Sequence, residues 1–131
     1  SCKGLIKGIA NAALVRCQES RRYFMTGEDL MNLPIVPLHQ DLVHLAALGI
    51  DNIERNGHHY VRGLDHLSLS ERQECLREND DLYSNSNEIQ GLRIESGTIR
   101  VSSLQRPGLG VGDNVDLHSM IPLPDWDFKT L

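Results

Sequence analysis

The chain has 131 residues, 40% of them hydrophobic, and its 13 Lys and Arg against 18 Asp and Glu give a formal charge of −5. This length fits one domain or less. An acidic chain without a Lys/Arg block lacks the positive surface that duplex DNA requires, which excludes a nucleic-acid partner.

No apolar run approaches the roughly 20 residues that cross a bilayer, and the start has no signal-peptide pattern. Three widely spaced cysteines, an odd number, indicate a reducing compartment, so we expect a cytoplasmic protein with no membrane partner.

The first half of the sequence alternates helical and extended patterns. Apolar residues recur at three- and four-residue steps over 4–19, which predicts an amphipathic helix, and the Tyr-Phe-Met run in 22–26 predicts a short buried strand. Residues 38–48 predict a second helix, and 50–54 predict a second strand. This alternation is typical of an α/β fold with parallel strands. Two parallel strands cannot cover both faces and both edges of a sheet, so residues 1–66 are interpreted as a sector of a larger structure.

The second predicted helix has one polar face. Its leucines share one side, while His39, Gln40, Asp41 and His44 lie opposite. His39 and His44 are therefore expected to face water, and neither is given a functional role.

The second half has a different organisation. Ser68-Leu69-Ser70-Glu71 forms a capping box and predicts a helix over 69–78. The segments 91–95 and 98–102 alternate apolar and polar residues on either side of Ser96-Gly97, which predicts a β-hairpin.

Carboxylates follow both predicted strands. Glu28 and Asp29 come after the first strand, and Glu54 ends the second. Reacting groups gather at the carboxyl ends of strands in barrels and open α/β sheets, so we expect these acids on one rim. The alternative is that Glu28 and Asp29 only form a turn, and that Glu54 pairs with Arg55 or Arg62 on the surface.

Histidine and lysine residues flank these acids. His58 and His59 point to opposite sides of an extended segment, so they are not expected to bind one metal ion together. One of them can face the rim as an acid, a base or a hydrogen-bond donor, although a structural role for both stays open. Lys3 precedes the first helix and can serve as a base or as an electrostatic stabiliser. A solvated surface charge is the alternative for Lys3 and for Lys7.

Three segments together resemble the last third of a (β/α)8 barrel of the enolase superfamily, in its mandelate racemase and muconate lactonising branch. They are Ser-Cys-Lys-Gly before the first helix, Thr-Gly-Glu-Asp-Leu after the first strand, and Ile-Glu-Arg-Asn-Gly-His-His-Tyr after the second. The stretches 91–94, 96–99 and 107–111 are similar to the branch's C-terminal hairpin and proline-glycine loop. The resemblance covers nearly the whole chain. It implies a TIM-like barrel sector over 1–66, from the end of strand 6 to strand 8 and its loop. A C-terminal helix, hairpin and tail over 67–131 would pack on the barrel or the lid domain.

The resemblance also implies roles for individual residues. Lys3 would lie at the end of the sixth barrel strand, where some members keep a catalytic lysine, with Lys7 as the alternative register. Glu28 and Asp29 occupy the end of the seventh strand, where mandelate racemase-like members often carry a histidine. This departure puts the usual histidine-aspartate base in doubt.

Glu54 matches the glutamate at the end of the eighth strand, which in the family hydrogen-bonds the substrate carboxylate as it becomes an enediolate. From the residues themselves, His58 or His59 at the rim is expected to bind the small carboxylate substrate.

The implied reaction removes the proton next to the carboxylate of a hydroxy or sugar acid, and Mg²⁺ stabilises the enediolate. The family's metal ligands come from the third to fifth strands, which this chain lacks. We therefore expect the C-terminal segment of a dehydratase, racemase or epimerase, inactive as an isolated chain and part of a homo-oligomeric parent. A non-catalytic barrel relative or a small-molecule binding module is the alternative. A small α/β hydrolase is disfavoured because the chain has no Gly-x-Ser-x-Gly elbow.

Overall fold

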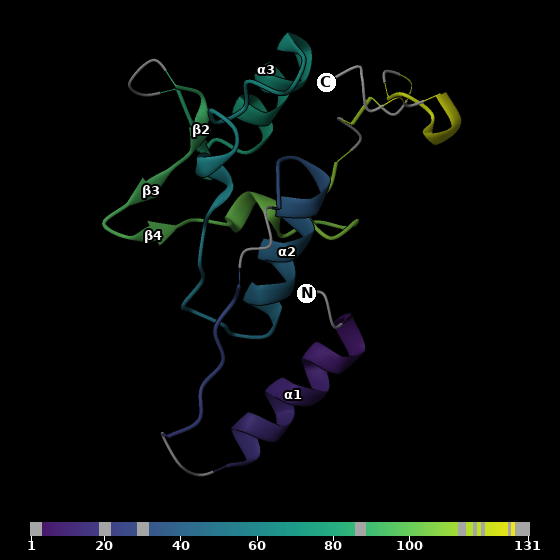
Figure 1. Cartoon of the computed structure of the whole chain (residues 1–131). Coiled ribbons are helices and arrows are strands. Elements are labelled where there is room, and N and C mark those ends of the chain that lie inside the picture. Colours follow the sequence, from purple (N-terminus) through teal and green to yellow (C-terminus); the bar gives the residue numbers. More distant parts are fainter. Residues whose placement is uncertain are drawn as a thin grey trace.

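The computed structural model describes residues 4–18, 22–28, 32–85, 89–112, 115–116, 118, 120–125 and 127, without the side chain of His58. The helices are α1 (Leu5–Cys17), α2 (Val36–Ala47) and α3 (Leu69–Glu78), with short 3-10 turns η1 (Gly57–His59), η2 (Ser102–Leu104) and η4 (Leu123–Asp125). The strands are β1 (Tyr83–Ser84), β2 (Gly91–Leu92), β3 (Ile94–Glu95) and β4 (Thr98–Ile99). Figure 1 shows α1 at one end of the molecule, α2 in the middle and α3 toward the other end.

The mixed α/β class predicted from the sequence is confirmed. The described residues form three α-helices and two antiparallel two-stranded sheets, and within this part of the chain no barrel closes. None of the described helices is long and apolar enough to cross a bilayer.

All three predicted helices are present, with small shifts at their ends. The helix predicted over 4–19 extends from Leu5 to Cys17, and the one predicted over 38–48 from Val36 to Ala47, with a proline in its first turn. The third helix has the predicted bounds. Its capping box is also confirmed, because the Ser68 hydroxyl accepts from the Glu71 N–H at 3.3 Å and a Glu71 carboxylate oxygen accepts from the Ser68 N–H at 3.0 Å.

The two segments predicted as parallel strands meet at a single pair of residues, one of which, Gly27, lies just past the predicted strand over 22–26. Gly27 and Ile53 form a parallel bridge, in which the Gly27 N–H donates to Asn52 O and the Glu54 N–H donates to Gly27 O, both at 2.9 Å. The parallel relation is therefore confirmed, but the expectation of regular strands over 22–26 and 50–54 is wrong. A strand is held by partners along its length, and in the described residues these segments share no pairing beyond this bridge.

The predicted hairpin over 91–102 is divided between two sheets. β1 and β2 pair in antiparallel register, with Tyr83 opposite Leu92. β3 and β4 form a shorter hairpin in which Ile94 lies opposite Ile99. Its turn residues Ser96 and Gly97 both have positive φ, 51° and 75°, as a two-residue hairpin turn requires.

The hydrophobic core lies around α2, α3 and the β1–β2 pair, while α1 lies outside it (Figure 1). Ala12 is the one described residue of α1 that is buried. Large apolar side chains are exposed on α1 and on the extended segment after it: Leu5, Ile6, Ile9, Leu14, Tyr23 and Phe24. The core itself consists of Ile35, Leu38, Leu42, Leu64, Cys75, Leu82, Tyr83 and Leu104.

Candidate functional site

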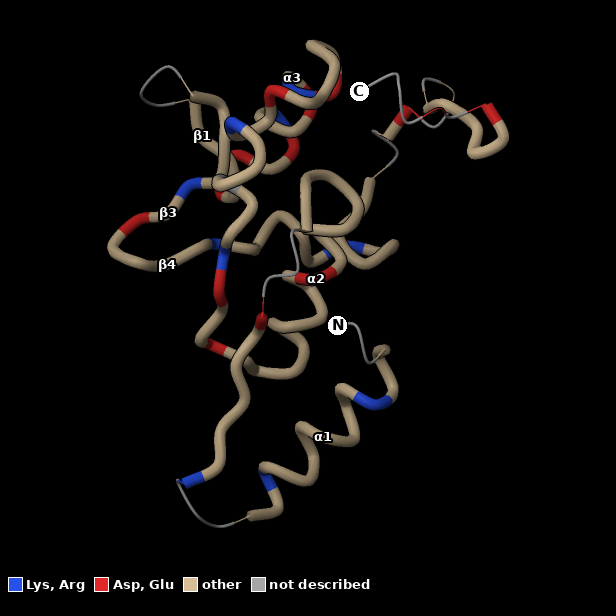
Figure 2. The backbone as a smooth tube through the Cα atoms, in the orientation of Figure 1, with Lys and Arg blue, Asp and Glu red and all other residues tan. Residues whose placement is uncertain are grey.

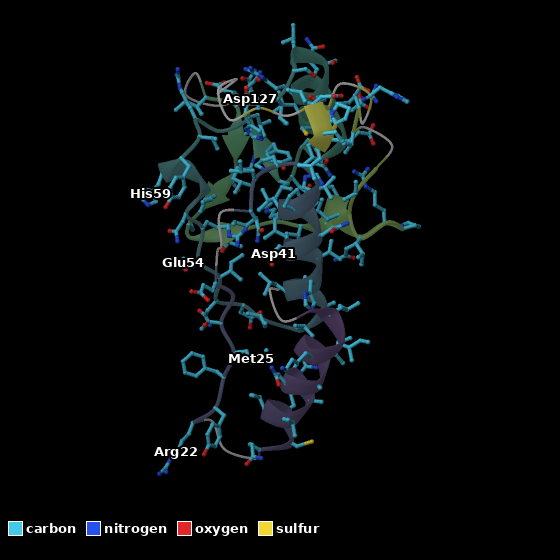
Figure 3. All side chains as sticks on the ribbon, turned by 45° about the vertical axis from the view of Figure 1, so that its right-hand side comes forward. Arg22, Met25, Asp41, Glu54, His59 and Asp127 are labelled. Atoms are coloured by element: carbon cyan, nitrogen blue, oxygen red, sulfur yellow. The ribbon has the colours of Figure 1, made fainter. Side chains whose placement is uncertain are left out.

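The bridge brings the two acid-bearing turns next to each other. Glu28 follows Gly27 and Glu54 follows Ile53, so each acid occupies the first position beyond the paired residues. Both side chains are exposed. Figure 3 shows Glu54 at the outer side of the molecule, on the same side as His59, with Asp41 further in. The two carboxylates can therefore be reached from solvent at one edge of the fold, which we call the acid rim (Glu28 and Glu54).

The structure describes only some of the other predicted site residues. Lys3 and Asp29 lie outside the described residues, and so does the side chain of His58. His59 belongs to η1, lies five residues after Glu54, and has an exposed side chain. Lys7 lies on α1 and is exposed. Figure 2 shows that the charged residues of α1 are basic, whereas acidic residues lie near the bridge and on α3.

A buried ion pair lies directly behind the acid rim and was not predicted. The Arg55 Nη2 atom lies 3.1 Å from Asp41 Oδ2, and the two side chains are only 8% and 2% exposed. Arg55 Nε also donates a hydrogen bond to the backbone carbonyl of Glu54. The alternative in which Glu54 pairs with Arg55 on the surface is wrong, because Arg55 turns inward and contacts the Glu54 backbone instead.

His39 is a second buried polar residue of α2, and the expectation that it faces water is wrong. It is 0% exposed, because β1 and the loop around Gly110 cover this side of the helix. The Gly110 carbonyl can only accept, so His39 Nδ1–H donates to it at 3.1 Å, and the neutral ring accepts at Nε2 from the Tyr83 hydroxyl at 2.8 Å. Burial, helped by Arg106, lowers the pKa of His39 to about 4 despite the opposing effect of the Gly110 hydrogen bond.

An apolar cavity of about 220 Å³ opens among residues that follow both bridged segments. Arg55 is the one charged residue among its described lining residues, and neither Glu28 nor Glu54 lines it. The cavity can hold a small apolar group, but it does not join the two acids. Its walls are formed by Asn32, Leu33, Pro34, Leu38, Arg55, Gly57, Val61, Gly63, Leu64, Ile89, Gly91, Leu92 and Ile94.

The chemistry available at the acid rim is hydrogen bonding and proton exchange by two exposed carboxyl groups. Within the described ranges, no group of three or more His, Cys, Asp or Glu residues could hold a metal ion. These residues alone therefore do not fit a magnesium site. A scan against protein-family models, a search of curated proteins and a search of solved structures each found no match for this chain.

Proposed function

We propose that the chain is the C-terminal sector of a (β/α)8 barrel enzyme of the enolase superfamily, in its mandelate racemase and muconate lactonising branch. The observation that carries the proposal is the parallel bridge between Gly27 and Ile53, whose segments are connected through α2 and are each followed by an acid. Neighbouring parallel strands linked by a helix are the repeating unit of such a barrel, and its reacting groups follow the strand ends. Two of the three motifs that resemble this branch, 26–30 and 53–60, contain the bridged residues.

The uncovered apolar surface also supports a sector of a larger barrel. Tyr23 and Phe24 are adjacent in the extended segment and are 59% and 73% exposed, so both faces of this segment are open to solvent. On α1, Ile6 is 84% exposed. In a closed barrel, a preceding strand and its helix would cover such surfaces.

In the proposed reaction the parent enzyme removes the proton α to the carboxylate of a hydroxy or sugar acid. In its protonated form, Glu54 donates a hydrogen bond to the substrate carboxylate as negative charge develops on the substrate oxygens, which stabilises the enediolate more than the ground state. The α proton passes to Lys3 as the base or, where Lys3 instead provides a positive charge beside the reacting carbon, to the carboxylate of Glu28 or Asp29. His58 or His59 contacts the substrate. Because the described residues do not form a magnesium site, the proposal leaves the Mg²⁺ ligands to the rest of the barrel.

The test is solvent-deuterium incorporation by the full-length parent protein. A dehydratase, racemase or epimerase of this kind breaks the α C–H bond first, so deuterium from D₂O should enter the recovered substrate or its keto-acid product. The assay uses a panel of hydroxy and sugar acids with Mg²⁺ present. No exchange with any acid, together with binding of a small apolar molecule, would favour the alternative of a non-catalytic binding module, for which the 220 Å³ cavity is the supporting observation.

The role of Glu54 is tested by Glu54→Gln in the same parent protein. We expect kcat to fall about a hundredfold or more with folding intact, because the amide N–H of glutamine is a much weaker acid than a carboxyl O–H and stabilises the charge developing on the substrate oxygens less. Glu95→Gln is the matched control, since Glu95 is an exposed glutamate of β3 whose carboxylate lies 3.8 Å from Arg100. Unchanged turnover in Glu54→Gln would remove Glu54 from the reaction.

A further inference from the structure

The backbone of Glu54 is held from both sides. Its N–H donates to Gly27 O at 2.9 Å across the parallel bridge, and its carbonyl accepts from Arg55 Nε. Arg55 is fixed in turn by Asp41 of α2, with 3.1 Å between Nη2 and Oδ2 and with both side chains almost fully buried. A single guanidinium group therefore connects the middle helix to the peptide that carries one acid of the rim.

We infer that Asp41 and Arg55 are positioning residues for Glu54, an inference that rests on the function proposed for that glutamate. They fix the Glu54 peptide, and with it the direction in which the carboxyl group leaves the backbone, relative to Gly27 and Glu28. The planar guanidinium offers several N–H donors in a rigid fork, so one group can bind a carboxylate and a carbonyl at once. A lysine ammonium keeps the charge but has no such fork.

Stability alone does not account for this pair. Burying two charges costs much of what their attraction gains, and an apolar pair of similar volume is often as stable. Fixed geometry is what the buried pair provides and an apolar pair cannot, because Arg55 directs one donor at the Glu54 carbonyl and another at Asp41. Replacing the guanidinium group by a lysine ammonium keeps the charge, so we expect the hydrogen bonds of the Gly27–Ile53 bridge to open more often while the rest of the fold is unchanged.

The variant that removes the fork is Arg55→Lys in the full 131-residue chain, followed by amide hydrogen exchange measured by NMR at neutral pH. The amides of Gly27 and Glu54 are the two donors of the bridge, so they report on it directly. We expect both to exchange about tenfold faster, as the loss of one charge-assisted hydrogen bond predicts. The amide of Leu42, in the buried part of α2, should change less than about twofold.

The matched control is Arg72→Lys. Arg72 forms the same kind of fork at the start of α3, with Nη1 3.0 Å from Asp65 Oδ1, Nη2 donating to Asp65 O at 2.9 Å and Nε donating to Leu67 O at 3.0 Å. It should leave exchange at Gly27 and Glu54 unchanged. The inference is overturned if Arg55→Lys leaves these two amides unchanged. It is also overturned if every amide accelerates by the same factor, because the pair then only stabilises the fold.

A measurement on the unaltered chain keeps the inference testable if Arg55→Lys does not fold. The Nε–H of Arg55 should exchange at least about tenfold more slowly than that of Arg100, whose side chain is 69% exposed. Equal rates would show that the contact with the Glu54 carbonyl is not maintained, which also overturns the inference. Absence of α-proton exchange in the parent enzyme would refute the proposed function and leave these rates as they are, so the two failures are distinguishable.

Discussion

Acidification should destabilise this fold through one histidine. His39 is fully buried, donates from Nδ1 to Gly110 O and accepts at Nε2 from the Tyr83 hydroxyl. Its pKa is lowered from 6.5 to about 4, chiefly because burial penalises the charged ring. Unfolding exposes the ring to water and returns the pKa to its ordinary value, so folding and proton binding compete.

The direction and the size of the pH effect on the free energy of unfolding follow from the two pKa values of His39. Between pH 6.5 and pH 4 the unfolded chain binds a proton at His39 that the folded chain does not. The contribution of His39 to the free energy of unfolding is therefore complete above pH 6.5 and is lost as the pH falls toward 4. The difference of 6.5 − 4 = 2.5 pKa units corresponds to about 3 kcal/mol. This is a large share of the 5–15 kcal/mol typical of a folded domain.

The assay is urea unfolding followed by circular dichroism at pH values from 7.5 to 4.5. The comparison is with the double variant His39→Leu, Tyr83→Phe, which removes the titrating ring and also the hydroxyl that would be left without its acceptor. Carboxylates titrate in both proteins, so the difference between the two stability curves isolates His39. His59→Gln, at an exposed histidine, is the control and should follow the unaltered protein. Parallel curves for the unaltered protein and the double variant would refute the reasoning.

Two further predictions concern stability at neutral pH. Ser68→Ala should lower the free energy of unfolding by about 1 kcal/mol, because its hydroxyl caps the Glu71 N–H of α3; a change below about 0.3 kcal/mol in urea unfolding would contradict this. Leu104→Ala, at a fully buried core position, should cost about 2–5 kcal/mol. Leu14→Ala on α1, where the side chain is 64% exposed, should cost less than about 0.5 kcal/mol. Equal losses at the two leucines would show that α1 is packed into the core.

The elements that sequence patterns predicted well are those whose stabilising contacts are local. The bounds of α3 follow from a capping box that spans four residues, and the turn at Ser96 and Gly97 follows from the φ values that those two residues tolerate. The strand expected over 22–26 depends instead on partners elsewhere. The expectation that this segment is buried is also wrong, because Tyr23 and Phe24 are largely exposed. Apolar composition alone cannot supply the neighbouring strand that would cover the segment and turn one bridge into a ladder.

The expectation that the polar side of α2 faces water is wrong for a related reason. A helical pattern shows which side is apolar, but it does not show whether a distant segment covers the other side. Gln40 is exposed as expected, whereas His39 and Asp41 are buried by partners 44, 71 and 14 residues away. One feature of the sequence could have predicted that the Arg55 side chain turns inward. In an extended segment it points opposite to Glu54, and therefore away from the predicted rim.

The hydrogen bonds of His39 also bear on the order in which the chain folds. They join residues 44 and 71 positions apart, so each can form only when a long loop has closed. The capping box of α3, by contrast, can form as soon as one helical turn does. Substitutions at His39 or Tyr83 should therefore speed unfolding and leave the folding rate almost unchanged, whereas Ser68→Ala should slow folding itself.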